Sequence, residues 1–311
     1  MRSFSISQAA GAGFRVIRER PLSVFMWGLL PTLAGLIVMG LYVAVMGPMF
    51  LELFASFGGG SAPDEARIQT LLNQNQVGSS LLSLLGLLTL PLTIAVFGAV
   101  QRAVLLPGTA RSWFGMRLTS REGWSFLSYF VVFLMVYFAF LAAVLVTIGL
   151  SFVLAGALPT PIDVLACVVL VVAVLAVFAW VALRLSLAPA MAFAENKFIL
   201  AETWSLTQGN GGRLFGLGLL LILIILALEL VMLAVLALMG GAAYAALGMD
   251  IDQLRALVSG PVGGWAPWVG VLALVALPVL AWFSGVLNTV ALAPFADVYR
   301  QLSGSAVAEE F

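Results

Sequence analysis

The chain alternates long apolar runs with short segments that carry nearly all of its charges. Six runs reach the roughly 20 residues that a helix needs to cross a hydrocarbon core of about 30 Å. They cover residues 22–46, 80–105, 124–152, 163–183, 214–239 and 267–293. Backbone polar groups in lipid find no water to bond with, so each run is predicted to be a transmembrane helix.

A mixed polar and apolar segment precedes every odd-numbered run, at residues 7–20, 111–122 and 195–213. In the first segment, Ala10, Phe14 and Ile17 share one face of a helix, while the arginines point elsewhere. A helix with one apolar face and one basic face lies in the membrane interface. Each segment is therefore predicted to be an interfacial amphipathic helix.

Every even-numbered run ends in a similar hexapeptide, with Leu at its fourth position and Pro at its sixth. The copies are RAVLLP at 102–107, RLSLAP at 184–189 and TVALAP at 289–294. We expect an all-α membrane protein of six transmembrane helices in three hairpin repeats, each introduced by an interfacial helix. The repeats would cover 1–110, 111–194 and 195–300, with 301–311 as a cytoplasmic tail. The alternative is that helical hairpins produce such a pattern by chance.

Positive charge predicts the orientation. Of the 14 Lys and Arg residues, 12 fall on one side of the predicted helices, and only Arg67 and Arg255 fall on the other. By the positive-inside rule, both termini are expected in the cytoplasm. The first apolar run is too long for the core of a signal peptide and is expected to be retained.

Composition agrees with a membrane protein and narrows its chemistry. The 311 residues are 63% apolar and 9% charged, with a mean hydropathy of +1.14; soluble domains carry about 25% charged residues. The net charge is zero, which gives no field to attract nucleic acid. Histidine is absent and Cys167 is the single cysteine, which excludes zinc sites, Ser–His catalysis and an internal disulfide. No metal, cofactor or enzymatic activity is expected.

Glu229 is the strongest candidate for a functional residue, because it lies well inside the fifth run. Charged residues at the centre of a membrane helix cost roughly 2.5–3.5 kcal/mol on insertion scales and usually face the interior of the bundle. Glu229 is interpreted either as a proton, cation or substrate site, or as a protonated side chain that bonds to a neighbouring helix.

Three polar residues mark the ends of the even-numbered runs. Arg102 and Arg184 begin two of the hexapeptides, where they could hold lipid phosphates at the inner leaflet or extend to the interface without a ligand. Asn288 lies six residues before Pro294 and is expected to form a hydrogen bond between helices.

Several stretches resemble a known family. They are SISQA at 5–9, FRVIRERP at 14–21, TWSLTQG at 203–209, RLF at 213–215 and APFADVYR at 293–300. They resemble the six-span membrane domain of bacterial glycerophosphodiester phosphodiesterases and related domains of unknown function, over nearly the whole chain. The resemblance implies a helical membrane fold. Together with the absence of organelle signals, it also implies that the protein lies in the cytoplasmic membrane of a bacterium. It implies no enzymatic activity, since the catalytic barrel that accompanies that domain is not in this sequence.

Two functions follow from these patterns. The first is a non-enzymatic inner-membrane protein that organises or binds lipid, or serves as an accessory subunit of a membrane complex. It rests on the three interfacial segments and the small loops. The alternative is a transporter or channel-like protein for a small or lipid-like solute, which rests on Glu229 and the prolines within the spans. The expected partners are membrane lipids and a protein partner or a second copy, with no nucleic acid.

Overall fold

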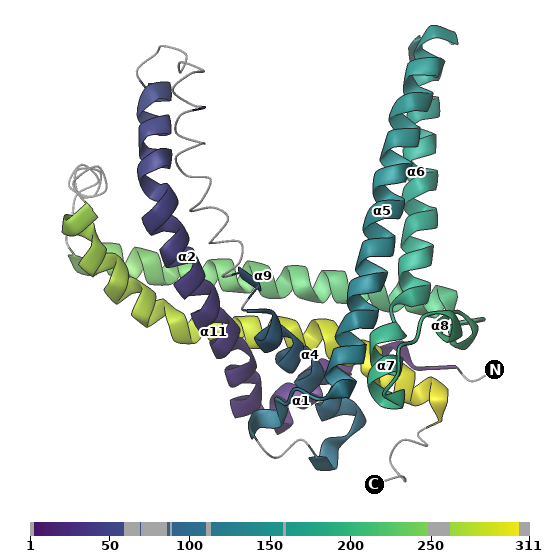
Figure 1. Cartoon of the computed structure of the whole chain (residues 1–311), viewed down its shortest axis with the longest axis horizontal. Coiled ribbons are helices and arrows are strands. Elements are labelled where there is room, and N and C mark those ends of the chain that lie inside the picture. Colours follow the sequence, from purple (N-terminus) through teal and green to yellow (C-terminus); the bar gives the residue numbers. More distant parts are fainter. Residues whose placement is uncertain are drawn as a thin grey trace. The chain divides into compact units, whose positions relative to one another are not determined.

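The computed structural model describes residues 3–58, 69, 86–87, 89–109, 113–157, 160–247 and 262–304. Most of the first half of the predicted second span and residues 305–311 of the predicted tail lie outside them. Every regular element in these ranges is a helix (Figure 1). The prediction of an all-α protein is confirmed for this part of the chain.

Five helices are long and apolar enough to cross a membrane. They are α2 (Pro21–Gly58), α5 (Ser120–Ala157), α6 (Thr160–Leu185), α9 (Gly211–Leu247) and α11 (Val262–Ser303). A shorter apolar helix, α4 (Leu90–Leu105), forms the end of the predicted second run. The chain therefore has the architecture of a multi-pass helical membrane protein, while a sixth complete span stays a prediction.

The first predicted interfacial segment is a helix, α1 (Ile6–Glu19). The Ser5 side chain accepts a hydrogen bond from the backbone N–H of Gln8 and caps the helix start. One face is buried through small residues, including Ala9, Ala12 and Gly13. A Cβ on Gly13 would come within 2.8 Å of the Val290 Cα, so α1 packs closely against α11.

The helix predicted at 111–122 is wrong. The described part contains only a single 3-10 turn, η2 (Trp113–Gly115), and α5 begins at Ser120. The backbone N–H of Thr119 donates to Glu122 Oε2 at 2.9 Å, and the Thr119 hydroxyl bonds to the same oxygen. This is the Glu half of a T-x-x-E capping box, which starts a helix at its threonine and leaves the preceding residues outside it.

The segment predicted as a helix at 195–213 is also broken. It contains the end of α7 (Ala188–Glu195), the short α8 (Ala201–Leu206) and the start of α9. Asn196 has a φ of 53° and Gly209 a φ of 80°. These left-handed conformations end a right-handed helix, so one amphipathic helix cannot run through the segment.

The third hexapeptide does not end its helix. α4 and α6 end within the first two copies, as predicted, but α11 continues through Pro294 to Ser303. Residues 301–303 of the predicted tail are therefore helical. Ala296, Asp297, Val298 and Tyr299 are all buried, and this packing outweighs the hydrogen bond that a proline removes from a helix.

The helices form two compact units, and several helices pass from one unit to the other. Unit 1 comprises Met1–Val24, Ala95–Val235 and Val286–Phe311, and unit 2 comprises Phe25–Ile94 and Leu236–Gly285. In unit 2, α2 crosses α11 so closely that a Cβ on Gly28 would overlap the Ala281 carbonyl oxygen and the Gly285 nitrogen. The adjacent Trp27 is fully buried.

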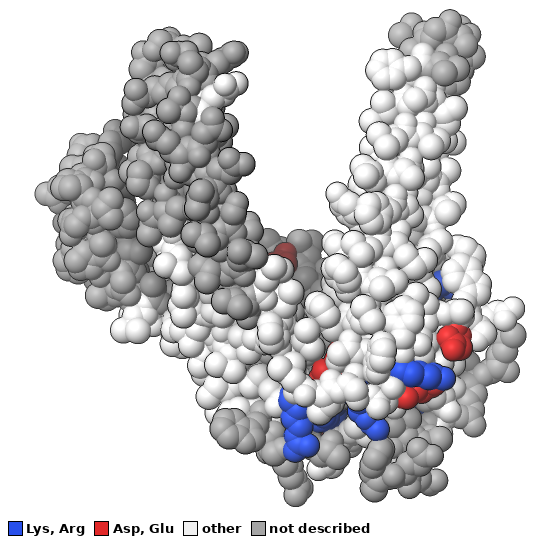
Figure 2. Space-filling model, in the orientation of Figure 1, with Lys and Arg blue, Asp and Glu red and all other residues white. Residues whose placement is uncertain are grey.

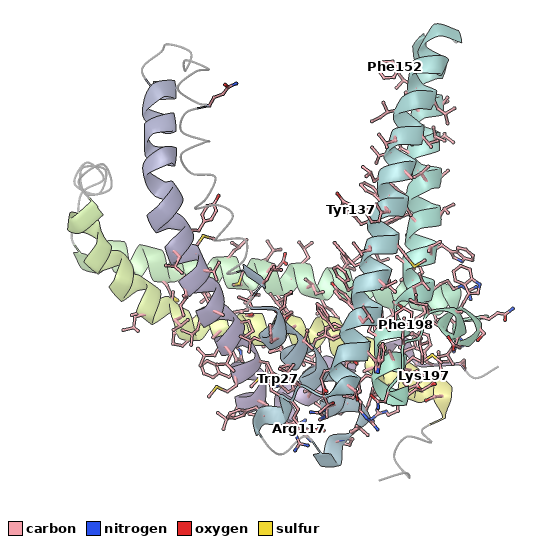
Figure 3. All side chains as sticks on the ribbon, in the orientation of Figure 1. Trp27, Arg117, Tyr137, Phe152, Lys197 and Phe198 are labelled. Carbon is pink, nitrogen blue, oxygen red and sulfur yellow. The ribbon has the colours of Figure 1, made fainter. Side chains whose placement is uncertain are left out.

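In unit 1, α5 and α6 form an antiparallel hairpin, with α7 against α5 and α8 against α6 (Figure 1). No residue is buried in the most apolar stretch of α5 or of α6. Tyr137 and Phe152, for example, project outward from α5 (Figure 3) and are 51% and 78% exposed. Among the residues that Figure 2 colours by charge, those near this hairpin lie toward its packed end. We call the packed, charge-bearing end of unit 1 the base. It comprises α1, α7 and α8, the starts of α5 and α9, and the ends of α4, α6 and α11.

Candidate functional site

A buried ion pair holds the base together. Arg102, at the end of α4, pairs with Glu122 in the first turn of α5, and their side chains are 5% and 0% exposed. Arg102 Nη1 also donates to the Gly115 carbonyl oxygen at 2.9 Å, and the guanidinium lies 5.7 Å from the Phe193 ring centroid. The pair therefore connects α4, η2, α5 and α7.

Neighbouring residues leave space for this pair and satisfy the polar groups beside it. Gly98 lies one turn before Arg102, and a Cβ there would overlap the Glu122 side chain. Ser125, one turn after the start of α5, bonds to Gln101 Oε1 at 2.9 Å and to the Pro189 carbonyl oxygen at 2.8 Å. Each of these groups is buried. The arrangement satisfies buried polar atoms and has the character of a structural core.

The surroundings of Arg102 do not match the hypothesis that it binds lipid phosphates. At 4% exposure it presents almost no surface to a ligand, and its guanidinium has protein partners instead. The signal that sequence reasoning missed is the T-x-x-E box at 119–122, which places an acid at the start of α5. That acid lies next to the end of α4 in the base.

A second ionic cluster centres on Asp297 in α11, whose side chain is fully buried. Arg15 of α1 donates to its carboxylate at 2.9 Å, and Arg300 pairs with the same oxygen. Gln301 Nε2 donates to the other oxygen at 2.7 Å, while Gln301 Oε1 accepts from the Ser5 backbone N–H at 2.8 Å. Asp297 therefore fastens α1 to the end of α11.

We expect Asp297→Asn to loosen α1 from α11 by about 1–2 kcal/mol, because two arginines lose their counter-charge at positions that solvent partly screens. Hydrogen–deuterium exchange of residues 6–19 should accelerate in the variant. Arg18→Gln on the same helix is the matched control, since Arg18 is exposed and should leave exchange unchanged. Equal exchange in the wild type and Asp297→Asn would contradict the role of the cluster.

Arg184, at the end of α6, is held differently. Its guanidinium lies 5.3 Å from the Trp180 ring and 5.4 Å from the Trp204 ring, and these rings meet at 90° with centroids 4.9 Å apart. Nη1 is 3.5 Å from both the Trp204 carbonyl oxygen and Thr207 Oγ1. Nε is buried without a hydrogen-bond partner among the described residues. Aromatic faces, and no described carboxylate, therefore stabilise this cation.

A groove of about 350 Å³ opens beside Arg184, between α6 and α9. Its walls are mainly apolar, and Arg184 and the first turn of α9 form its polar part. The lining residues are Ala176, Ala179, Trp180, Leu183, Arg184, Gly211, Gly212, Leu214 and Phe215. A second groove, of about 320 Å³, lies between α5 and α6 and is lined only by apolar side chains. The first groove thus offers both a cation and an apolar surface.

The structure does not bring Glu229 or Asn288 to these features. Glu229 is exposed on α9, between the exposed Leu226 and Leu230, and it lines neither groove. Asn288 is half-buried on α11 and has no hydrogen-bond partner in the described part of the chain. The interior position expected for Glu229 is therefore not found within the described residues.

No group of three or more His, Cys, Asp or Glu residues in the described ranges is arranged to hold a metal ion. Comparison with known proteins finds no matching family model, no matching curated protein and no matching solved structure. The resemblance to the membrane domain of glycerophosphodiester phosphodiesterases stays a prediction, and the function has to be argued from the geometry.

Proposed function

We propose that this chain is a non-enzymatic protein of the bacterial cytoplasmic membrane, with six spans and cytoplasmic termini, that binds and organises lipid. The observation that carries the proposal is the division of unit 1 into an ion-paired base and an apolar hairpin. The hairpin presents its surface outward, with no buried residue in its most apolar stretches. A surface of this kind needs lipid or another protein to cover it.

The charges of the base support a structural role. Glu122 pairs with Arg102, and Asp297 pairs with Arg15 and Arg300. Glu195 pairs with Lys197 at 2.9 Å, and the hydrogen bond and charge of Glu195 raise the pKa of the Lys197 ammonium. A general acid or base needs a carboxyl group that can reach a substrate proton. These carboxyl groups are engaged by cations instead, which favours a scaffold over an enzyme.

The outward face of α5 supports contact with lipid. Its exposed aromatic residues include Tyr129, Phe133, Tyr137 and Phe138, at 45% to 59% exposure. Aromatic and aliphatic side chains on every side of a long helix are typical of a membrane span, whereas in water they would drive aggregation. The charged side chains that Figure 2 shows near the packed end of the hairpin support an interface on that side, and the excess of positive residues in the sequence favours the cytoplasmic side for it.

The contacts of the two arginines also support repetition of the hairpin unit. Arg102 contacts Glu122, and Arg184 contacts Trp204, and in each pair the partner lies 20 residues further along the chain. Each arginine therefore reaches the segment that follows its own helix. The third hexapeptide has Thr289 in place of an arginine and lies within a continuing helix, so the third unit departs from this pattern.

Native mass spectrometry of the protein, extracted gently from its own membrane, tests the proposal. A lipid or a protein subunit bound in a fixed ratio would support an organising or accessory role. Protein that carries neither, under conditions that keep lipid on a known lipid-binding membrane protein, would contradict it.

The alternative of a transporter that uses Glu229 has less support, because Glu229 lies on an exposed face and lines neither groove. We expect Glu229→Gln to change the stability little, because Glu229 forms no ion pair with a described residue and glutamine has nearly the same shape. It should also leave bound lipid unchanged. A proton flux into liposomes that the wild type supports and Glu229→Gln abolishes would favour the transporter.

A further inference from the structure

The groove between α6 and α9 separates apolar from cationic groups along its length. Ala176, Ala179 and Leu183 follow α6 toward its end, and Leu214 and Phe215 face them from α9. The stretch from 176 to 184 covers about 12 Å at the rise of an α-helix. Arg184 lies at the end of that stretch, and Gly212 of α9 also lines the groove. A bound molecule would therefore need an apolar portion joined to an anionic portion.

Arg184 differs from Arg15, Arg102 and Arg300 in forming no salt bridge with a described carboxylate. Arg102 pairs with Glu122, and Arg15 and Arg300 pair with Asp297, whereas no described carboxylate forms a salt bridge with Arg184. Within the described ranges, its hydrogen bonds are two long contacts from Nη1 to neutral oxygens. A guanidinium has five N–H donors in a planar fork that suits phosphate. The groove therefore holds a cation with unused capacity for an anion.

The start of α9 adds to the same polar region. The first N–H groups of a helix have no partner within it, and the helix dipole favours negative charge there. Gly211 and Gly212 form this first turn and line the groove. A Cβ on either glycine would meet nothing within 4 Å, so there is open space beside both residues.

Trp180 and Trp204 indicate the depth of this region. They are 47% and 39% exposed, and both flank Arg184. Tryptophan favours the level of the lipid headgroups, with its ring toward the hydrocarbon and its N–H toward water. Arg184 then lies at phosphate level, and the apolar walls of the groove lie at acyl-chain level.

We propose that this groove binds one anionic phospholipid of the cytoplasmic leaflet, with its phosphate at Arg184 and the first turn of α9 and an acyl chain along the apolar walls. The inference rests on the proposed function and names the class of lipid and the site. Free phosphate would satisfy Arg184 but would leave the apolar walls uncovered, so the geometry favours the lipid.

The test measures binding to the full chain in detergent by native mass spectrometry. The probes are phosphatidylglycerol, the zwitterionic phosphatidylcholine and inorganic phosphate. Arg184→Gln removes the cation, and Gly212→Leu places a side chain in the open space of the groove while leaving Arg184 in place. Arg18→Gln is the control, because it removes one exposed arginine of the base outside the groove.

We expect one phosphatidylglycerol per chain to bind the wild type more tightly than phosphatidylcholine, with no displacement by inorganic phosphate. Arg184→Gln should weaken phosphatidylglycerol binding about tenfold to a hundredfold, the range for a hydrogen bond to a charged group. Gly212→Leu should weaken it more than Arg18→Gln does. The effect of Arg18→Gln should stay below about fivefold, as for one surface charge near a membrane.

Equal losses in Arg184→Gln and Arg18→Gln would overturn the site, because they would indicate general surface attraction. Wild-type affinity in Gly212→Leu would overturn the groove as the binding place. Displacement by inorganic phosphate would overturn the phospholipid as ligand. If phosphatidylglycerol binds the wild type and both groove variants equally, the site is wrong and lipid binding stands. If no lipid binds the wild type, the proposed function fails with it.

Discussion

Glu122→Ala is expected to lower the free energy of unfolding by about 3–5 kcal/mol, the cost of leaving one partner of a buried ion pair without the other. The Arg102 guanidinium would keep its position at 5% exposure, with the Gly115 carbonyl and the Phe193 ring as its remaining contacts. The variant would also lose the hydrogen bond that starts α5 at Thr119. Unfolding of the purified protein, by heat or by a denaturing detergent, measures the loss.

Two controls separate the charge from general damage. The double variant Arg102→Met with Glu122→Leu replaces the pair by apolar groups and should recover much of the stability, because both desolvated charges are removed. Lys197→Ala breaks an ion pair whose side chains are 56% exposed at Lys197 and 32% exposed at Glu195, and should have little effect. A loss in Glu122→Ala no larger than in Lys197→Ala would show that the buried pair does not stabilise the base.

Gly28→Ala is expected to destabilise unit 2 by about 1–3 kcal/mol, although it adds a single methyl group. The added Cβ would overlap the Ala281 carbonyl oxygen and the Gly285 nitrogen, which are backbone atoms of α11. A flexible side chain could turn away, but backbone atoms move only if the helices separate. Small residues allow membrane helices to approach in this way, and close packing is the main attraction between them in lipid.

Gly35→Ala is the matched control, because it makes the same change in the same helix two turns further on. Nothing lies within 4 Å of a Cβ at Gly35, so only the helix propensity changes. Alanine is favoured over glycine there by up to about 1 kcal/mol. The two variants should thus shift the unfolding midpoint in opposite directions. A shift of the same sign and size in both would mean that α2 and α11 do not cross closely at Gly28.

The spans could be predicted from the sequence because each depends on one strong local property, its apolar run. An apolar run of about 20 residues has to be a helix in lipid, so α2, α5, α6, α9 and α11 follow from length and composition. The described part of α4 agrees with the end of the second run. The predicted boundaries were less accurate, since α2 and α5 extend beyond the apolar runs.

The interfacial segments were predicted less well because two local signals compete there. Phe114 and Leu118 are spaced four apart, which suggests one helical face, but the T-x-x-E box at 119–122 starts a new helix after them. The box was visible in the sequence and would have given the correct start of α5. It would also have separated Glu122 from the interfacial segment.

The contacts of the base depend on distant parts of the chain and lie beyond such patterns. Arg15 and Asp297 are 282 residues apart, and no periodicity relates them. Gly28 is one of 31 glycines, and only the crossing with α11 distinguishes it. Arg102 and Arg184 look equivalent in the hexapeptides, yet one meets a carboxylate and the other two indole rings.

The Asp297 cluster has a consequence for the order in which the protein matures. Ser5 and Arg15 leave the ribosome almost 300 residues before their partners Gln301 and Asp297. α1 therefore has to wait, without its contacts to Asp297 and Gln301, while the helices between them are made and inserted. It docks on α11 only after those helices have been synthesised, so the contact reports that all of them are present.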